Sequence, residues 1–211
     1  MHLELSEVLA CPACGPPQVM VAVVAEGHGT RVIHGFLGCP ACDSRFPIRH
    51  GTVHLREGGD AERGESVSHP DLPDSPASLL GAVLSLGVGS GRLLLSPALA
   101  GIGRELAELV DRWEVVSLVH AAPAEEELHE RLTRIVLPDD GRVPVLGGRF
   151  QAVALSGSPG PERLTQYAWA LAPLGRLGVL APGAIAPETL REAGLELVAS
   201  DARVAVASRP S

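Results

Sequence analysis

Four cysteines stand in two closely spaced pairs near the start of the chain. Each pair has the C-x2-C spacing that folds the backbone into a tight turn and points two thiolates at one site. Two such turns complete the tetrahedral shell of four sulfurs that zinc prefers, and soft thiolates disfavour magnesium and calcium. The alternatives are a disulfide pair, a redox C-x2-C and an iron–sulfur cluster. The spacing predicts one structural zinc ion, without an open catalytic position, held by Cys11, Cys14, Cys39 and Cys42.

The 24 residues between the two pairs predict the element that brings them together. Two β-type runs, 18–26 and 30–37, flank Gly27-His28-Gly29, which is a glycine turn of the kind found in hairpins. A hairpin returns the second pair to the side of the first. Four thiolates saturate a zinc ion, so the nearby histidines are interpreted as surface or hairpin-face residues. They are His34, His50 and His54.

Residues 5–14 (LSEVLACPAC) and 39–55 (CPACDSRFPIRHGTVHL) carry a family resemblance. They resemble the small zinc-ribbon activator subunits of tRNA, rRNA and release-factor methyltransferases. In that family the second cysteine turn is followed by an aromatic-Pro-Ile, an Arg, a Gly and a short last strand. The resemblance implies a ribbon that docks on a methyltransferase-type fold and that does not itself catalyse.

Composition limits the possible partners. The chain has 211 residues, 45% hydrophobic, and its net charge is −8, from 17 basic residues, all of them Arg, and 25 acidic ones. Such a balance gives no support to nucleic-acid binding. The first ten residues lack the basic and apolar regions of a secretory signal, and no apolar run approaches a membrane span. We therefore expect no membrane association and a cytoplasmic protein, where thiols stay reduced and bind metal.

The chain divides into three parts by pattern: a zinc ribbon at 1–56, a polar linker rich in Gly and Pro at 57–75, and an α/β domain at 76–211. Short apolar strands alternate with helices in the third part, which predicts a mostly parallel sheet covered on both faces. Helices are predicted at 76–86, 101–111, 123–134, 161–171 and 187–193. Strands are predicted at 92–96, 114–119, 150–155, 177–180, 195–199 and 204–207. The last two are too close for a crossover, so they form an antiparallel hairpin.

A parallel sheet that ends in a hairpin resembles the Rossmann-like fold of S-adenosylmethionine-dependent methyltransferases. Phrases at 147–155 (GGRFQAVAL), 171–177 (LAPLGRL) and 190–196 (LREAGLE) are similar to those around the fourth, fifth and sixth strands of that fold. The resemblance implies a cofactor loop after the first strand, made of a glycine-rich turn behind an acidic residue. It also implies a second acid at the end of strand two, for the ribose hydroxyls.

Two registers can place the cofactor loop. In the first, the candidate cofactor-binding residues are Gly87, Gly89 and Gly91, with a Ser in place of the acid. In the second, the first strand is 93–96 and the turn is 97–103, so the following helix and strand have normal lengths. We prefer the second register, because a match to the lengths of whole helices and strands is stronger evidence than a match to a nine-residue phrase.

Both registers lack the acids of the family. In the preferred register Ser96 holds the first acidic position, and Ala98 and Ala100 hold glycine positions, where each Cβ crowds the turn. Strand two ends in Val119-His120 where a carboxylate is expected. Each lost charge-assisted contact weakens binding by about 1.5–3 kcal/mol. S-adenosylmethionine is therefore a doubtful ligand.

No catalytic set can be argued from spacing elsewhere in the chain. The sequence favours a non-catalytic, methyltransferase-like protein that acts as a scaffold or as an activating partner of another protein. That partner could be a methyltransferase, or the chain could form a homo-oligomer. The competing hypothesis is an active methyltransferase whose ribbon guides the substrate, and a zinc-ribbon nucleic-acid binder is the least favoured.

Overall fold

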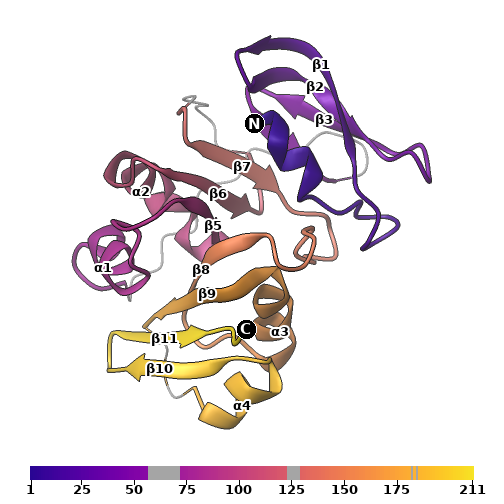
Figure 1. Cartoon of the computed structure of the whole chain (residues 1–211). Helices are drawn as coiled ribbons and strands as arrows, with labels where there is room; N and C mark the ends of the chain where they lie inside the picture. The colour runs from indigo at the N-terminus through magenta and orange to yellow at the C-terminus, as the bar shows by residue number, and fades with distance from the viewer. Residues whose placement is uncertain (57–71, 123–128, 182, 184) are drawn as a thin grey trace. The chain divides into compact units, whose positions relative to one another are not determined.

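The computed structural model describes residues 1–56, 72–122, 129–181, 183 and 185–211 (Figure 1). Contacts group the chain into two compact units, one of Met1–Ser66 with Leu118–Leu146 and one of Val67–Ser117 with Gly147–Ser211. The segment 118–146 thus packs with the N-terminal residues. The domain boundaries predicted at 56 and 76 stay a prediction, and most of the predicted linker lies outside the described residues.

The first unit is a ribbon of antiparallel strands that follows a short 3-10 helix, η1 (Leu3–Glu7). Its strands are β1 (Val21–His28), β2 (Arg31–Gly38), β3 (Arg45–Arg49) and β4 (Thr52–His54). Consecutive strands pair antiparallel, from Val21 opposite Gly38 to Arg49 opposite Thr52. The predicted hairpin is confirmed: it turns at Gly29, whose φ of 57° suits a residue without a Cβ.

The last ribbon strand pairs with a segment far along the chain. Strand β7 (Leu132–Val136) lies parallel to β4, with Val53 opposite Ile135 and His54 opposite Val136. Residues 129–134 fell within the helix predicted at 123–134, and that prediction is wrong there; residues 123–128 lie outside the described residues. The charged residues favour a helix only weakly, and the buried, partly β-branched pattern of β7 outweighs them.

The second unit is an α/β sheet. In Figure 1 its strands run in the order β6-β5-β8-β9-β11-β10. Strands β6, β5, β8 and β9 are mutually parallel, and β11 lies antiparallel between β9 and β10. The predicted parallel sheet with a final antiparallel hairpin is therefore confirmed. The strands are β5 (Gly91–Leu95), β6 (Trp113–Val119), β8 (Phe150–Ser156), β9 (Leu171–Leu180), β10 (Glu196–Ser200) and β11 (Val204–Ser208).

Helices cover this sheet. They are α1 (Pro76–Val83), α2 (Gly103–Leu109), α3 (Pro161–Ala170) and α4 (Pro187–Glu192), with a 3-10 helix η2 (Pro97–Ile102) after β5. Helix α1 packs on α2 and α3 on α4. Leu93 to Leu95 and Ala152 to Leu155 are buried without alternation, as in strands that are covered on both faces. Within the described parts of the chain, no helix has the length and apolar character of a membrane span.

Candidate metal centre

The two C-x2-C turns have the same backbone geometry. The N–H of Gly15 donates to the carbonyl of Cys11 at 2.8 Å, and the N–H of Asp43 donates to that of Cys39 at 3.0 Å. Gly15 and Asp43 each follow the second cysteine of a pair and have positive φ angles, of 73° and 58°. In each turn this backbone hydrogen bond brings the two cysteines together, and both sulfur atoms point toward the same cluster.

The structure brings the four predicted cysteines together. Their sulfur atoms all lie within 4.8 Å of one another, with Cys11 to Cys42 at 3.7 Å and Cys14 to Cys39 at 3.8 Å. A tetrahedral zinc ion with Zn–S bonds of about 2.3 Å separates its sulfurs by about 3.8 Å. The spacing and the donor set therefore fit a zinc ion bound by four thiolates, and such a shell leaves no position for a reacting water.

Hydrogen bonds already favour one thiolate in this cluster. The side chain and the backbone of Ser44 lower the pKa of Cys42 to about 6, and the Sγ of Cys42 lies 3.2 Å from the Oγ of Ser44. The hydrogen bond with Cys42 raises the pKa of Cys14 to about 12, and burial raises that of Cys11. The thiolate of Cys42 is thus stabilised by Ser44 first and by the neighbouring thiol of Cys14 second. A bound dication would remove the remaining protons.

A seam of polar contacts holds the ribbon to β7. The ring Nε2 of His2 lies 2.6 Å from the carbonyl oxygen of Glu130. Arg31 donates to the carbonyls of Glu130 and Leu132 at 2.6 and 3.3 Å. Beyond β4, the N–H of Leu55 donates to the carbonyl of Val136 at 3.1 Å. The ribbon therefore contacts the backbone of β7 at both ends of that strand, at Leu132 and at Ile135–Val136.

A second contact joins the first cysteine turn to the segment after β7. Ala10 donates its N–H to the carbonyl of Pro144 at 3.0 Å, and Leu146 donates to that of Val8 at 2.8 Å. Leu9 and Val145 form an isolated antiparallel bridge. The metal-bearing turn and the segment 129–146 are thereby parts of one packed body, which was not expected from the sequence.

The β4–β7 seam encloses a histidine. His54 is only 4% exposed, so of the two interpretations, surface or hairpin face, the surface position is wrong; the residue lies on β4 of the ribbon. Neither of its ring nitrogens has a hydrogen-bond partner in the part of the chain that the structure describes. Burial lowers the pKa of His54, and the charge of Arg49 lowers it further. The imidazole is therefore held neutral in the seam.

This histidine predicts a pH dependence of stability. Since the folded pKa lies below the ordinary value of about 6.5, the unfolded chain binds the proton more readily. Stability should therefore fall as the pH drops below about 6.5, by at most about 1.4 kcal/mol per pH unit for this one group. Denaturant titrations at about pH 7 and about pH 5.5 should show a smaller loss in His54→Leu than in the wild type. The exposed His28→Asn serves as the control, and equal losses in all three proteins would contradict the prediction.

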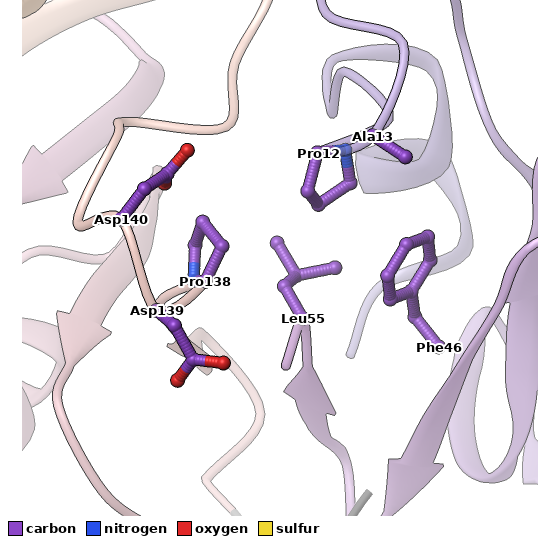
Figure 2. Close-up of a pocket in the computed structure, with 7 residues that line it drawn as sticks. All are labelled: Pro12, Ala13, Phe46, Leu55, Pro138, Asp139 and Asp140. Carbon is purple, nitrogen blue, oxygen red and sulfur yellow. The ribbon is translucent and has the colours of Figure 1, made fainter. Parts of the chain in front are cut away.

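A shallow pocket of about 210 Å³ lies beside the first cysteine turn (Figure 2). Its walls are mainly apolar, and two carboxylates stand at one side of it. Asp139 lies 3.3 Å from Arg56 and Asp140 is hydrogen-bonded to Arg142, so both carboxylates have arginine partners. The pocket presents no nucleophile with a base beside it. Its lining residues are Pro12, Ala13, Phe46, Leu55, Pro138, Asp139 and Asp140.

The first strand of the preferred register is present as β5, and the role of the turn after it in holding a cofactor stays a prediction. This strand ends at Leu95, and the turn after it begins at Ser96 and enters η2 at Pro97. The Oγ of Ser96, like that of Ser156 at the end of β8, is buried and lacks a hydrogen-bond partner among the described residues. In a parallel sheet, ligands bind at the carboxyl ends of such strands. Two hydroxyls lie there, and neither carries the negative charge of the family's acid.

The three candidate glycines lie at the other end of the strand. Gly87 and Gly89 precede β5 and Gly91 is its first residue. A Cβ on Gly91 would lie 2.5 Å from the Oε1 of Gln151, which accepts the N–H of Arg92 at 2.8 Å. At least Gly91 therefore has a packing reason to be glycine.

These observations define the class: an α/β chain with a methyltransferase-like fold, joined to a four-cysteine ribbon. The N-terminal resemblance is confirmed, because residues 2–51 match the model of the Trm112p-like protein family. No curated protein sequence matches the chain.

Several solved structures are similar to the chain at low sequence identity. The [4+2]-cyclase SpnF is similar with a TM-score of 0.50 and 16% identity, over 71% of this chain and 86% of the cyclase. A 1,6-didemethyltoxoflavin-N1-methyltransferase of Burkholderia thailandensis, solved with S-adenosylhomocysteine, has a TM-score of 0.47 and 19% identity, over 64% and 76% of the two chains. A complex of the Haloferax volcanii Trm112 methyltransferase activator with a putative methyltransferase has a TM-score of 0.47 and 11% identity, over 65% and 95%.

Proposed function

We propose that this protein is a non-catalytic scaffold or an activating partner of another protein, in which a zinc ribbon is built onto a methyltransferase-like sheet. The observation that carries the proposal is the turn after β5. Pro97–Ile102 forms a 3-10 helix where a cofactor loop would lie, and Ser96 stands at the acidic position. Ala98 and Ala100 add a Cβ each to a turn that needs close approach of the backbone to a ligand.

The ribbon is proposed to act within its own chain. Strand β4 is already paired with β7, so its backbone edge on that side is not open to a second protein. The ribbon would then be a fixed support for β7, with zinc as the ion that folds it. A reducing compartment such as the cytoplasm keeps the thiols available to that ion.

Titration of the zinc-loaded, full-length protein with S-adenosylmethionine tests the proposal. We expect a dissociation constant weaker than on the order of 100 μM, since two charge-assisted contacts are missing. Calorimetry of the wild type and of Ala98→Leu gives the answer. Tighter binding that is lost in Ala98→Leu would overturn the scaffold and support the active methyltransferase instead. Repeated co-purification of one methyltransferase would favour the activator over the scaffold.

A further inference from the structure

The end of α3 and the start of β9 carry an exposed tryptophan and an exposed leucine. Trp169, in the last turn of α3, is 52% exposed, and Leu174 is 73% exposed. Both residues are hydrogen-bonded to Arg209, which follows β11. The N–H of Leu174 donates to the carbonyl of Arg209 at 3.0 Å, and Nη1 of Arg209 donates to the carbonyl of Trp169 at 3.3 Å. These three residues and Arg149 form the tryptophan patch.

The tryptophan patch lies at the amino ends of the parallel strands. Strand β8 begins at Phe150 and β9 at Leu171, and these two residues pair with each other. Arg149 directly precedes β8, and its N–H donates to the carbonyl of Ala170 at 2.9 Å. The turn after β5 lies at the opposite, carboxyl edge of the sheet, where ligands bind in such folds. The patch is therefore separate from the candidate cofactor loop.

The indole of Trp169 is held in place by Gly147. A Cβ at this glycine would lie 2.5 and 2.6 Å from the ring carbons Cε2 and Cζ2, so the ring packs directly on the glycine backbone. Within the described residues the indole N–H makes no hydrogen bond. An aromatic ring that is fixed before binding loses little entropy when a partner covers it, and tryptophan and arginine are enriched in binding hot spots.

Leu174 has two features that are unfavourable in the isolated protein. Its φ of 62° lies in the left-handed region, which residues with a Cβ avoid and glycine adopts freely. Its side chain also exposes an apolar surface to water. A partner that covers the leucine would remove the second cost, and strained backbone of this kind is found at functional sites. Leu174 therefore indicates a contact surface.

The polar side-chain groups of the patch are all hydrogen-bond donors, and its charges are positive. None of residues 147–156, 163–180 and 202–211 is acidic, in a chain whose net charge is −8. Among the described residues, the guanidinium of Arg149 has no ion-pair partner, and Arg209 uses only Nη1, on two backbone carbonyls. Such a surface is complementary to carboxylates beside an apolar group. It suits nucleic acid less well, because the chain as a whole repels a polyanion.

We propose that the tryptophan patch binds an acidic segment of another protein. An apolar side chain of that segment packs against Trp169 and Leu174, and its carboxylates bind Arg149 and Arg209. The inference rests on the scaffold or activator function proposed above, and it adds the chemistry of the partner and the face of the molecule that binds it.

Tryptophan fluorescence of the zinc-loaded, full-length protein tests the proposal, because the second tryptophan, Trp113, is only 6% exposed. The probe is the blocked peptide Glu-Asp-Leu-Phe-Asp-Glu, compared with Lys-Arg-Leu-Phe-Arg-Lys and with a uridine hexanucleotide. The acidic peptide should shift the emission to the blue with a dissociation constant on the order of 100 μM. Raised salt should weaken this binding several-fold. The two comparison ligands should not bind, and Trp169→Phe should abolish the signal.

Four variants assign the contacts. Arg149→Glu should weaken binding at least about ten-fold, since it removes a charge-assisted contact and adds repulsion. Arg203→Glu changes the net charge equally at the opposite end of β11 and should bind as the wild type does. Leu174→Gly should weaken binding without lowering the melting temperature, because relief of the left-handed strain offsets the greater freedom of glycine in the unfolded chain. Leu174→Met keeps an apolar side chain in the same turn and should keep the affinity.

Three results would overturn the proposal: no binding of the acidic peptide at about 1 mM, equal binding of the basic peptide or of the hexanucleotide, and equal effects of Arg149→Glu and Arg203→Glu. A blue shift that depends on protein concentration without peptide, with twice the 21.9 kDa of one chain in sedimentation, would also overturn it, in favour of a second copy. Tight binding of S-adenosylmethionine would overturn the scaffold, whereas failure of the peptide alone would overturn only the patch.

Discussion

Removing the metal should unfold the ribbon, and β7, which pairs with the ribbon, should unfold as well. The four sulfurs lie within 4.8 Å of one another, and without a cation at least one thiolate lacks its counter-charge. Structural zinc contributes about 10–16 kcal/mol of apparent binding free energy in zinc-finger peptides at pH 7. A strong chelator should therefore abolish the cooperative thermal transition of the first unit. Circular dichroism and hydrogen exchange over residues 132–136 measure the loss.

The same experiment separates zinc from a disulfide. A reductant alone should leave the zinc-bound protein intact, whereas a chelator under reducing conditions should unfold it. Cys39→Ser should lower the zinc content well below one ion per chain. Ser44→Ala removes the hydrogen-bond partner of Cys42 but keeps four thiolates, so it should bind one ion. Chelated protein with the melting curve of the wild type would contradict a structural metal.

Local patterns in the sequence predicted what local contacts determine. The two cysteine turns, the hairpin at Gly29 and the final antiparallel pair each depend on a few neighbouring residues, and each is present. The register of the loop after β5 was also predictable, because 93–96 reads as a strand and leaves normal lengths for the next elements. That register placed the two alanines in the loop, whereas Ser96, which it made the last residue of the strand, follows the end of β5 at Leu95.

Contacts between distant residues could not be read in the same way. Val53 pairs with Ile135 across more than eighty positions, and no turn or spacing marks a parallel pair. The helix expected at 123–134 had acidic residues at its start and good helix formers, yet Thr133, Ile135 and Val136 are buried in β7. Their β-branched side chains were the signal for a strand. The enclosure of His54 followed from the same unpredicted pairing.

The β4–β7 pairing leads to the second large effect, which concerns Val53. This residue is fully buried at the centre of β4, opposite Ile135. Val53→Asp places a carboxylate there without a partner, and an uncompensated buried charge destabilises by about 3–5 kcal/mol. The first unit should lose most of its stability, and amide protection over 132–136 should fall with it. The matched control is Val88→Asp, since Val88 is 80% exposed and should tolerate the same change within about 0.5 kcal/mol.

Two readouts make the result specific to the seam. Denaturant unfolding gives the change in stability, and hydrogen exchange shows whether β7 opens together with the ribbon. If Val53→Asp opened the ribbon and left β7 protected, the ribbon would not support β7 within the chain. If Val53→Asp lost as little stability as Val88→Asp, Val53 would not be a core residue. The expected result is joint loss of protection in β4 and β7. It would mean that the folding of the zinc-bearing ribbon stabilises β7 by way of β4, whose three residues, Thr52–His54, are all buried.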